Sequence, residues 1–263
     1  MQKTHTIQVK TGNYYVISQY DEPILYDYIK GEKKDDNPNE IDTNQRKMDS
    51  VQNSSSRAKA TMKNLVKGNY KSFPASWNWR FITFTFAPKK AEPKGIDIQN
   101  LDHTNIQWKK FRQRLEYHFK QKIYYLTVHE RHKSGNIHYH TIFFNIPKIR
   151  NKDLAKIWGN GFIKNKRVKD LQHALNYILK YICKDIDDSR VKGKRAYFHN
   201  LPHKPVKERD IDTIVKTIPP KEHRLDETNS EYEYKDRNGN IRKVKIKTFF
   251  VPPDYKNPHN LSS

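Results

Sequence analysis

The sequence predicts an α+β fold in which helices flank a central antiparallel sheet. Three observations lead to this prediction: short runs of alternating apolar and polar residues recur, tight turns join two pairs of these runs, and amphipathic helical patterns stand between them. Such a mixture of hairpins and helices is typical of α+β domains. The chain of 263 residues is long enough to bury a core in one large domain or two modest ones.

The predicted elements divide the chain into three parts. Residues 1–75 form an accessory segment with a strand at NYYVISQY, a polar linker at residues 31–45 and a weakly amphipathic helix within residues 49–70 that stops at Gly68. Residues 76–200 form the main domain. Residues 201–263 are a C-terminal extension with a hairpin at residues 232–250, where a glycine-containing turn separates two strand-like runs.

The main domain alternates strands and helices. Its strands are predicted at FITFTF, IYYLTVHE, NIHYHTIFFN and GFIKNKRV, because apolar side chains alternate there and turn residues bound the runs. Its helices are predicted at residues 104–120, around LAKIWG and at residues 170–184. The first of these helices has one apolar stripe, formed by Trp108, Phe111, Leu115 and Phe119.

The charge of the chain indicates the class of its partner. It has 51 Lys and Arg against 29 Asp and Glu, a net charge of +22, and residues 1–60 hold equal numbers of both signs, so the whole excess lies in residues 61–263. Sixteen Tyr and twelve Phe accompany these cations. Basic grooves with interleaved aromatics suit single-stranded nucleic acid, because cations bind phosphates and rings stack on bases. A basic protein with an ordinary aromatic core would have the same composition.

The single cysteine, Cys183, excludes an internal disulfide framework and a thiolate zinc cluster. No signal-like apolar region follows Met1, and no run of about 18 apolar residues occurs, so neither secretion nor contact with a membrane is expected. The expected location is the reducing cytoplasm.

The segment HERHKSGNIHYH, residues 129–140, predicts a hairpin with three polar side chains on one face. His138 and His140 share a face because strand side chains alternate. If the loop is residues 133–135, with Gly135 in the left-handed conformation, Glu130 lies opposite His138 and Val128 lies opposite His140. A two-residue loop would send Glu130 to the other face.

Two neutral imidazoles and one carboxylate suit Mg²⁺ or Mn²⁺ acting as a Lewis acid, so Glu130, His138 and His140 are the predicted metal ligands. The alternative is a set of surface imidazoles on an exposed strand. His132 stands beside the turn and is predicted to contact the substrate, here DNA, or to face solvent.

The helix DLQHALNYILKYICKD, residues 170–185, carries two stripes. Its apolar stripe consists of Leu171, Ala174, Leu175, Ile178 and Ile182, and a second stripe on roughly the opposite side consists of Tyr177, Lys180, Tyr181 and Lys184. The tyrosines are therefore expected off the core-facing side. They could be ordinary aromatics with solubilising lysines.

Beside a divalent ion, the phenol of Tyr177 becomes a candidate nucleophile for a phosphodiester. An unperturbed tyrosine has a pKa of about 10, so it needs activation. Lys180 is spaced to assist Tyr177 or to hold the scissile phosphate, and Lys184 is predicted to contact DNA.

Three motifs together resemble the HUH endonuclease superfamily, specifically the rolling-circle replication initiation (Rep) proteins of small plasmids and single-stranded DNA phages. They are the apolar strand FITFTF, the motif ExHxxGxxHxH from Glu130 to His140, and YxxKYxxK, here YILKYICK. The resemblance covers about residues 80–200 and implies a ferredoxin-like core with the central antiparallel sheet.

By this resemblance Glu130, His138 and His140 hold the metal, and Tyr177 cuts DNA to leave a 5′-phosphotyrosine link and a free 3′-OH. Tyr181 receives the strand in a second transfer. The substrate would be single-stranded DNA or an origin hairpin in a bacterial host. No GxxxxGK[ST] loop is present, so a host helicase would unwind the DNA and a host polymerase would extend it.

Two alternatives stay open. Relaxases and transposases belong to the same superfamily, although conjugative relaxases place their tyrosine before the histidine pair, and here it follows. A non-catalytic module that binds single-stranded nucleic acid would use the same sheet and basic helices.

Overall fold

The computed structural model describes residues 3–25, 43–70, 73, 79–168, 170–181, 197–235 and 239–256. The chain divides into two compact units. The central unit comprises Thr43–Val66 and Phe73–Pro202, and the terminal unit comprises Met1–Asp42, Lys67–Ser72 and His203–Ser263. Within the described residues each unit contains one five-stranded antiparallel sheet accompanied by helices, so the predicted α+β class is confirmed.

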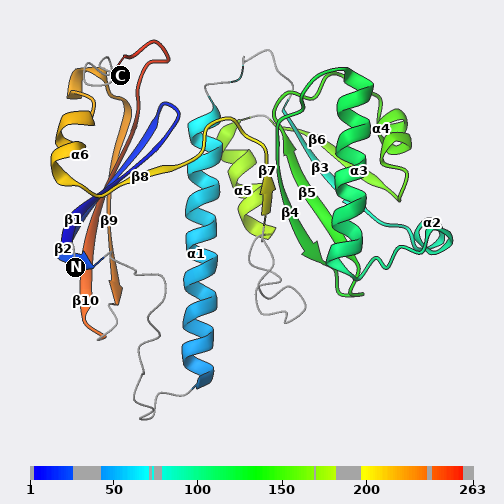
Figure 1. The fold of residues 1–263 in the computed structure, drawn as a ribbon, viewed down its shortest axis with the longest axis horizontal. Coiled ribbons are helices and arrows are strands. Elements are labelled where there is room, and N and C mark those ends of the chain that lie inside the picture. The colour runs from blue at the N-terminus through cyan, green and yellow to red at the C-terminus, as the bar shows by residue number, and fades with distance from the viewer. Residues whose placement is uncertain are drawn as a thin grey trace. The chain divides into compact units, whose positions relative to one another are not determined.

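The sheet of the central unit has the strand order β6-β3-β5-β4-β7, with every neighbouring pair antiparallel (Figure 1). Its strands are β3 (Arg80–Thr85), β4 (Tyr125–Arg131), β5 (Ile137–Phe143), β6 (Ile163–Arg167) and β7 (Tyr197–His199). The strand β5 therefore lies in the middle of the sheet, and β6 forms one edge.

Helices α3 (Leu101–Phe119) and α4 (Asn151–Trp158) cover one face of this sheet (Figure 1). Phe84 from β3 and Tyr139 from β5 pack there against Trp108, Phe111 and Trp158 from the two helices. The apolar stripe predicted for residues 104–120 is thus the stripe that α3 buries. A short helix α2 (Pro88–Ala91) and a 3-10 turn η1 (Glu92–Lys94) stand between β3 and α3.

The opposite face of the sheet is covered by α5 (Leu171–Tyr181) and by the central-unit part of α1 (Thr43–Tyr70) (Figure 1). Met62, Leu65 and Val66 of α1 belong to the same apolar cluster as Leu175 and Ile178 of α5. The middle strands are consequently buried on both faces, which explains why β4 and β5 are apolar in near-continuous runs.

The terminal unit brings the first and last parts of the chain into one sheet of order β8-β1-β2-β10-β9. Its strands are β1 (Lys3–Thr11), β2 (Tyr14–Leu25), β8 (Val206–Glu208), β9 (Leu225–Lys235) and β10 (Ile241–Phe250), accompanied by α6 (Ile211–Thr217) and the 3-10 turn η3 (Lys221–His223). The sequence predicted the β9–β10 hairpin and part of β2, but not the strand β1 that pairs with β2.

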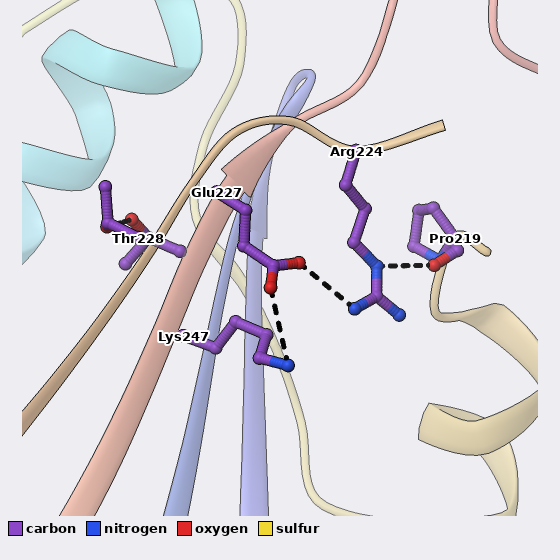
Figure 2. A network of polar contacts seen from close by, with 6 residues as sticks. Pro219, Arg224, Glu227, Thr228 and Lys247 are labelled. Atoms are coloured by element: carbon purple, nitrogen blue, oxygen red, sulfur yellow. Dashed lines mark hydrogen bonds and ion pairs between the residues drawn. The ribbon is translucent and has the colours of Figure 1, made fainter. Parts of the chain in front are cut away.

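A charged network fixes the start of β9 (Figure 2). Arg224 donates one hydrogen bond to the carbonyl oxygen of Pro219 at 2.8 Å and another to the carboxylate of Glu227 at 3.3 Å. The ammonium of Lys247, on the neighbouring strand β10, lies 3.6 Å from the same carboxylate. The two cations therefore share one anion across the hairpin.

The predicted helix stop at Gly68 is wrong, because α1 continues to Tyr70. A Cβ on Gly68 would overlap the carbonyl oxygen of Thr11 in the terminal unit, so this glycine serves a close approach of two backbones. Of the predicted linker, residues 31–42 lie outside the described residues, and residues 43–45 begin α1. No helix in the described part of the chain is both long and apolar enough to cross a membrane.

Candidate active site

The hairpin of β4 and β5 has the register that the sequence predicts. Glu130 pairs with His138 and Val128 pairs with His140. The amide of His132 donates to the carbonyl of Asn136 at 2.8 Å, which closes a three-residue loop, and Gly135 has a φ of +87°. Directly opposed residues of an antiparallel pair point to the same face. Glu130, His138 and His140 therefore share the face of the sheet that α5 covers.

The imidazole of His140 is held from both of its nitrogens. Its Nε2 lies 2.6 Å from Oε2 of Glu130, and its Nδ1 lies 3.1 Å from Oγ1 of Thr83 on β3. A carboxylate can only accept, so in the neutral ring Nε2 donates to Glu130 and Nδ1 accepts from the Thr83 hydroxyl. His140 is buried and the Glu130 side chain is 14% exposed, so this pair has little competition from water.

His138 is half-buried beside His132. Their rings stack with centroids 5.2 Å apart and planes inclined by 16°. Burial, aided by the neighbouring His132 and His140, lowers the pKa of His138 below its ordinary value despite the opposing charge of Glu130. At neutral pH His138 is therefore a neutral imidazole, which is the form that binds metals. His132 itself is exposed beside the turn.

The two tyrosines of α5 face the sheet, so the prediction that they lie off the core-facing side is wrong. The ring of Tyr181 stacks on His140 with centroids 3.6 Å apart and planes inclined by 9°. The ring of Tyr177 packs on Phe81 at 5.0 Å. At about 100° per residue, Tyr181 is only about 60° around the helix from the buried Ile178, so the tyrosines border the apolar stripe and extend it.

The cation beside the Tyr177 hydroxyl comes from β6. Nζ of Lys166 donates to Oη of Tyr177 at 3.2 Å and lies 5.1 Å from the ring centroid. Lys180, the cation that the sequence indicated for this role, is exposed. Lys184, predicted to contact DNA, lies outside the described residues. The alternation of lysines in IKNKR was the only available signal for Lys166, and it says nothing about the neighbour across the sheet.

Three rows of side chains cross the site face of the sheet, because β6, β3, β5 and β4 are paired in register. One row contains Thr85, His138 and Glu130. The next contains Lys164, Thr83, His140 and Val128, and the third contains Lys166, Phe81, Ile142 and Leu126. Polar groups of the site therefore occupy the first two rows, and the third row is an apolar floor under Tyr177 with a lysine at its edge.

The donors on this face have the chemistry of a divalent-metal site, namely two imidazole nitrogens and carboxylate oxygens. Two of the three predicted ligands, Glu130 and His140, are in direct contact. Within the described ranges, however, no group of three or more His, Cys, Asp or Glu side chains is arranged to hold a metal ion. The assignment of Glu130, His138 and His140 as ligands stays a prediction.

Comparison with known proteins supports a role in replication. Residues 79–186 match the family model of the replication-associated protein ORF2. The replication-associated protein ORF4 of Chlamydia phage 1 is 27% identical over an aligned region that covers 38% of this chain and 31% of the phage protein. The chain thus spans about a third of the length of that relative, and no solved structure is significantly similar to it. The matched region holds every described side chain of the candidate site, so the site belongs to the part of the chain that is similar to this family of replication-associated proteins.

Proposed function

We propose that this chain nicks single-stranded DNA at a specific sequence, joins itself to the cut strand through a tyrosine, and so initiates rolling-circle replication. One observation carries the proposal. Tyr177 and Tyr181 lie over the same sheet face as Glu130, His138 and His140, with the Tyr181 ring stacked on His140. A nucleophile, a cation and a candidate Lewis-acid site are thereby gathered on one surface.

The proposed first step is attack by Oη of Tyr177 on the scissile phosphorus. A bond forms between Oη and phosphorus, the bond from phosphorus to the 3′ oxygen breaks, the phenol proton is lost, and the released 3′ oxygen takes up a proton. Lys166 is placed to stabilise negative charge on Oη during the attack, because its ammonium already donates to that oxygen. The products are a 5′-phosphotyrosine link and a free 3′-OH that a host polymerase extends.

Glu130, His138 and His140 would hold a Mg²⁺ or Mn²⁺ ion, which would withdraw charge from the scissile phosphate when bound. Thr83 has a positioning role in this proposal. Its hydroxyl bonds Nδ1 of His140 and so fixes the orientation of the ring, as outer hydrogen-bond partners of metal-ligating histidines do.

Tyr181 is the proposed acceptor for the second transfer, in which the phosphodiester passes from one tyrosine to the other and the cycle closes. Its spacing of one helical turn from Tyr177 keeps both rings near the same phosphate. The proposed substrates are single-stranded DNA and an origin hairpin, with a host helicase supplying the unwound strand.

The absence of a metal-ready group among the described residues favours a second candidate, a non-catalytic module that binds single-stranded nucleic acid. The two candidates differ in covalent chemistry. Labelled single strands that tile the DNA around the coding gene are incubated with the protein and Mn²⁺, and adducts that survive denaturation are sought. We expect an adduct with the natural protein and with Tyr181→Phe, and none with Tyr177→Phe.

Binding without any adduct on any strand would support the non-catalytic module. An adduct that persists in Tyr177→Phe and disappears in Tyr181→Phe would exchange the roles of the two tyrosines. The metal is tested separately by titrating Mn²⁺ into the protein in a calorimeter. His138→Ala should lose most of the heat of binding, whereas His118→Ala, on α3 at the other face, should keep it.

A further inference from the structure

An exposed aromatic ring continues the first row of the site at the edge of the sheet. The pairing of β3 with β6 extends past Ile163, because the amide of Thr85 donates to the carbonyl of Phe162 at 3.0 Å and the amide of Ala87 donates to the carbonyl of Asn160 at 2.9 Å. Phe162 is thus opposite Thr85, in the register that pairs Thr83 with Lys164. It extends the row that contains His138 and Glu130.

The side-chain alternation along β6 gives the same placement. Ile163 packs against the cluster on the α3 and α4 face. Its neighbours Phe162 and Lys164 therefore point to the site face, together with Lys166. Phe162 is 74% exposed, although an antiparallel strand beside an apolar core could have buried a residue of this size.

Lysines alternate with this ring along the strand. Lys164 is exposed in the row of His140, and Lys166 is exposed in the row of Phe81 with its ammonium at the Tyr177 hydroxyl. Two strand spacings separate β6 from β5, so Lys164 and Phe162 lie roughly 10 Å across the sheet from the two histidines. A ring and two cations therefore line one edge of the site at intervals of two residues.

We propose that β6 is the track along which a single DNA strand enters the site, with a base stacked on Phe162 and phosphates on Lys164 and Lys166. This inference rests on the proposed function and adds the location of the strand. An aromatic ring contributes only when a base presents its face, so the track requires unpaired DNA, and the alternating cations match the polyanionic backbone. Because β6 is an edge strand, a nucleic acid lying on it has open space on one side.

The test is binding of a fluorescein-labelled oligothymidylate, followed by anisotropy in EDTA so that no cleavage interferes. Phe162→Ala should weaken binding about 5- to 100-fold, the range expected for loss of one stacked base. Phe162→Trp should bind like the natural protein because it keeps a ring. The matched control is Tyr117→Ala, which removes an aromatic ring that is 87% exposed on α3, and its affinity should not change.

Lys164→Ala should also weaken binding, with Lys109→Ala on α3 as its control. The melting temperatures of all these variants should stay the same, because each removed side chain is exposed. Unchanged affinity in Phe162→Ala would overturn the track, and so would an equal loss in Phe162→Ala and Tyr117→Ala. If Phe162→Ala loses affinity while no covalent adduct ever forms, the track stands and the proposed nicking function fails.

Discussion

At the scale of single residues, Lys166 contacts Tyr177 in two ways. Its ammonium donates to the hydroxyl oxygen at 3.2 Å and lies 5.1 Å from the centre of the ring. A charge-assisted hydrogen bond is stronger than a neutral one, and it gains further strength when its acceptor becomes negative. The contact therefore matters most at the moment when the phenol oxygen attacks.

Replacing this lysine should slow adduct formation. Lys166→Met keeps the length of the side chain and removes its charge, and we expect the rate to fall about 10-fold or more, as for the loss of one hydrogen bond to a charged group. Lys180→Met is the matched control on α5, where the lysine is exposed. Single-turnover adduct formation with labelled DNA measures both. An equal fall in both variants would mean that the lysines act only through the overall charge.

At the scale of elements, the β4–β5 hairpin is the part of the site that could be predicted best. Its register follows from local chemistry, because Gly135 tolerates a φ of +87° and a three-residue loop leaves Glu130 opposite His138. A local pattern of twelve residues thus contained the whole answer. The same holds for the apolar stripe of α3, which the sequence repeats at helical spacing.

The facing of α5 and the role of Lys166 depend on tertiary contacts that no local pattern contains. The apolar stripe of α5 is wide enough to take in Tyr177 and Tyr181 once Phe81 and His140 lie beneath them. Lys166 reaches Tyr177 because β6 pairs with β3 across about eighty residues of chain. The partner strand β1 was missed for a related reason, since its charged and polar side chains hide its alternation.

The glycine in the last turns of α1 offers a prediction whose sign separates two effects. Helix propensity alone favours alanine over glycine by about 1 kcal/mol. A Cβ on Gly68 would overlap the Thr11 carbonyl, and overpacking of this kind costs about 1–3 kcal/mol. We expect Gly68→Ala to lower the free energy of unfolding measured in urea. A more stable variant would mean that the backbone of β1 moves away at little cost.

The network at the start of β9 predicts a dependence of stability on pH. Burial alone would raise the pKa of the Glu227 carboxyl, but the hydrogen bond from Arg224 and the charge of Lys247 hold it below its ordinary value of 4.5. A lowered pKa in the folded state means that ionised Glu227 stabilises the fold above about pH 4.5, and that this contribution is lost as the pH falls through the folded-state pKa.

The variant Glu227→Gln should therefore melt at a lower temperature than the natural protein at pH 7, and the difference should shrink in acid. Glu231→Gln is the control on the same strand, because its ion pair with Lys243 is 4.0 Å long and exposed. Thermal unfolding followed by circular dichroism at neutral and acidic pH measures both. A difference for Glu227→Gln that is the same at every pH would show that the side chain contributes packing and no charge.

At the scale of the whole molecule, charge and fold are distributed differently. The net charge of +22 lies entirely in residues 61–263, and residues 1–60 are neutral overall. The terminal unit combines strands from both regions, whereas the central unit with the candidate site is built mostly from the basic region. The positive charge therefore accompanies the matched region and extends beyond it along the chain, which is the distribution expected of a protein that holds a long polyanion.

This distribution predicts a steep dependence of single-stranded DNA binding on salt. Each phosphate neutralised on a single strand lowers the slope of log affinity against log salt by about 0.7, so five neutralised phosphates give a slope of roughly −3.5 and about a 100-fold loss of affinity for a fourfold rise in salt. Anisotropy titrations with labelled oligothymidylate in EDTA over a series of KCl concentrations measure the slope. Lys164→Ala should make it shallower by about 0.7, whereas Phe162→Ala should weaken binding at every salt concentration without changing the slope, because stacking releases no counterions. A nearly flat salt dependence in the natural protein would mean that its excess of cations does not meet the phosphates.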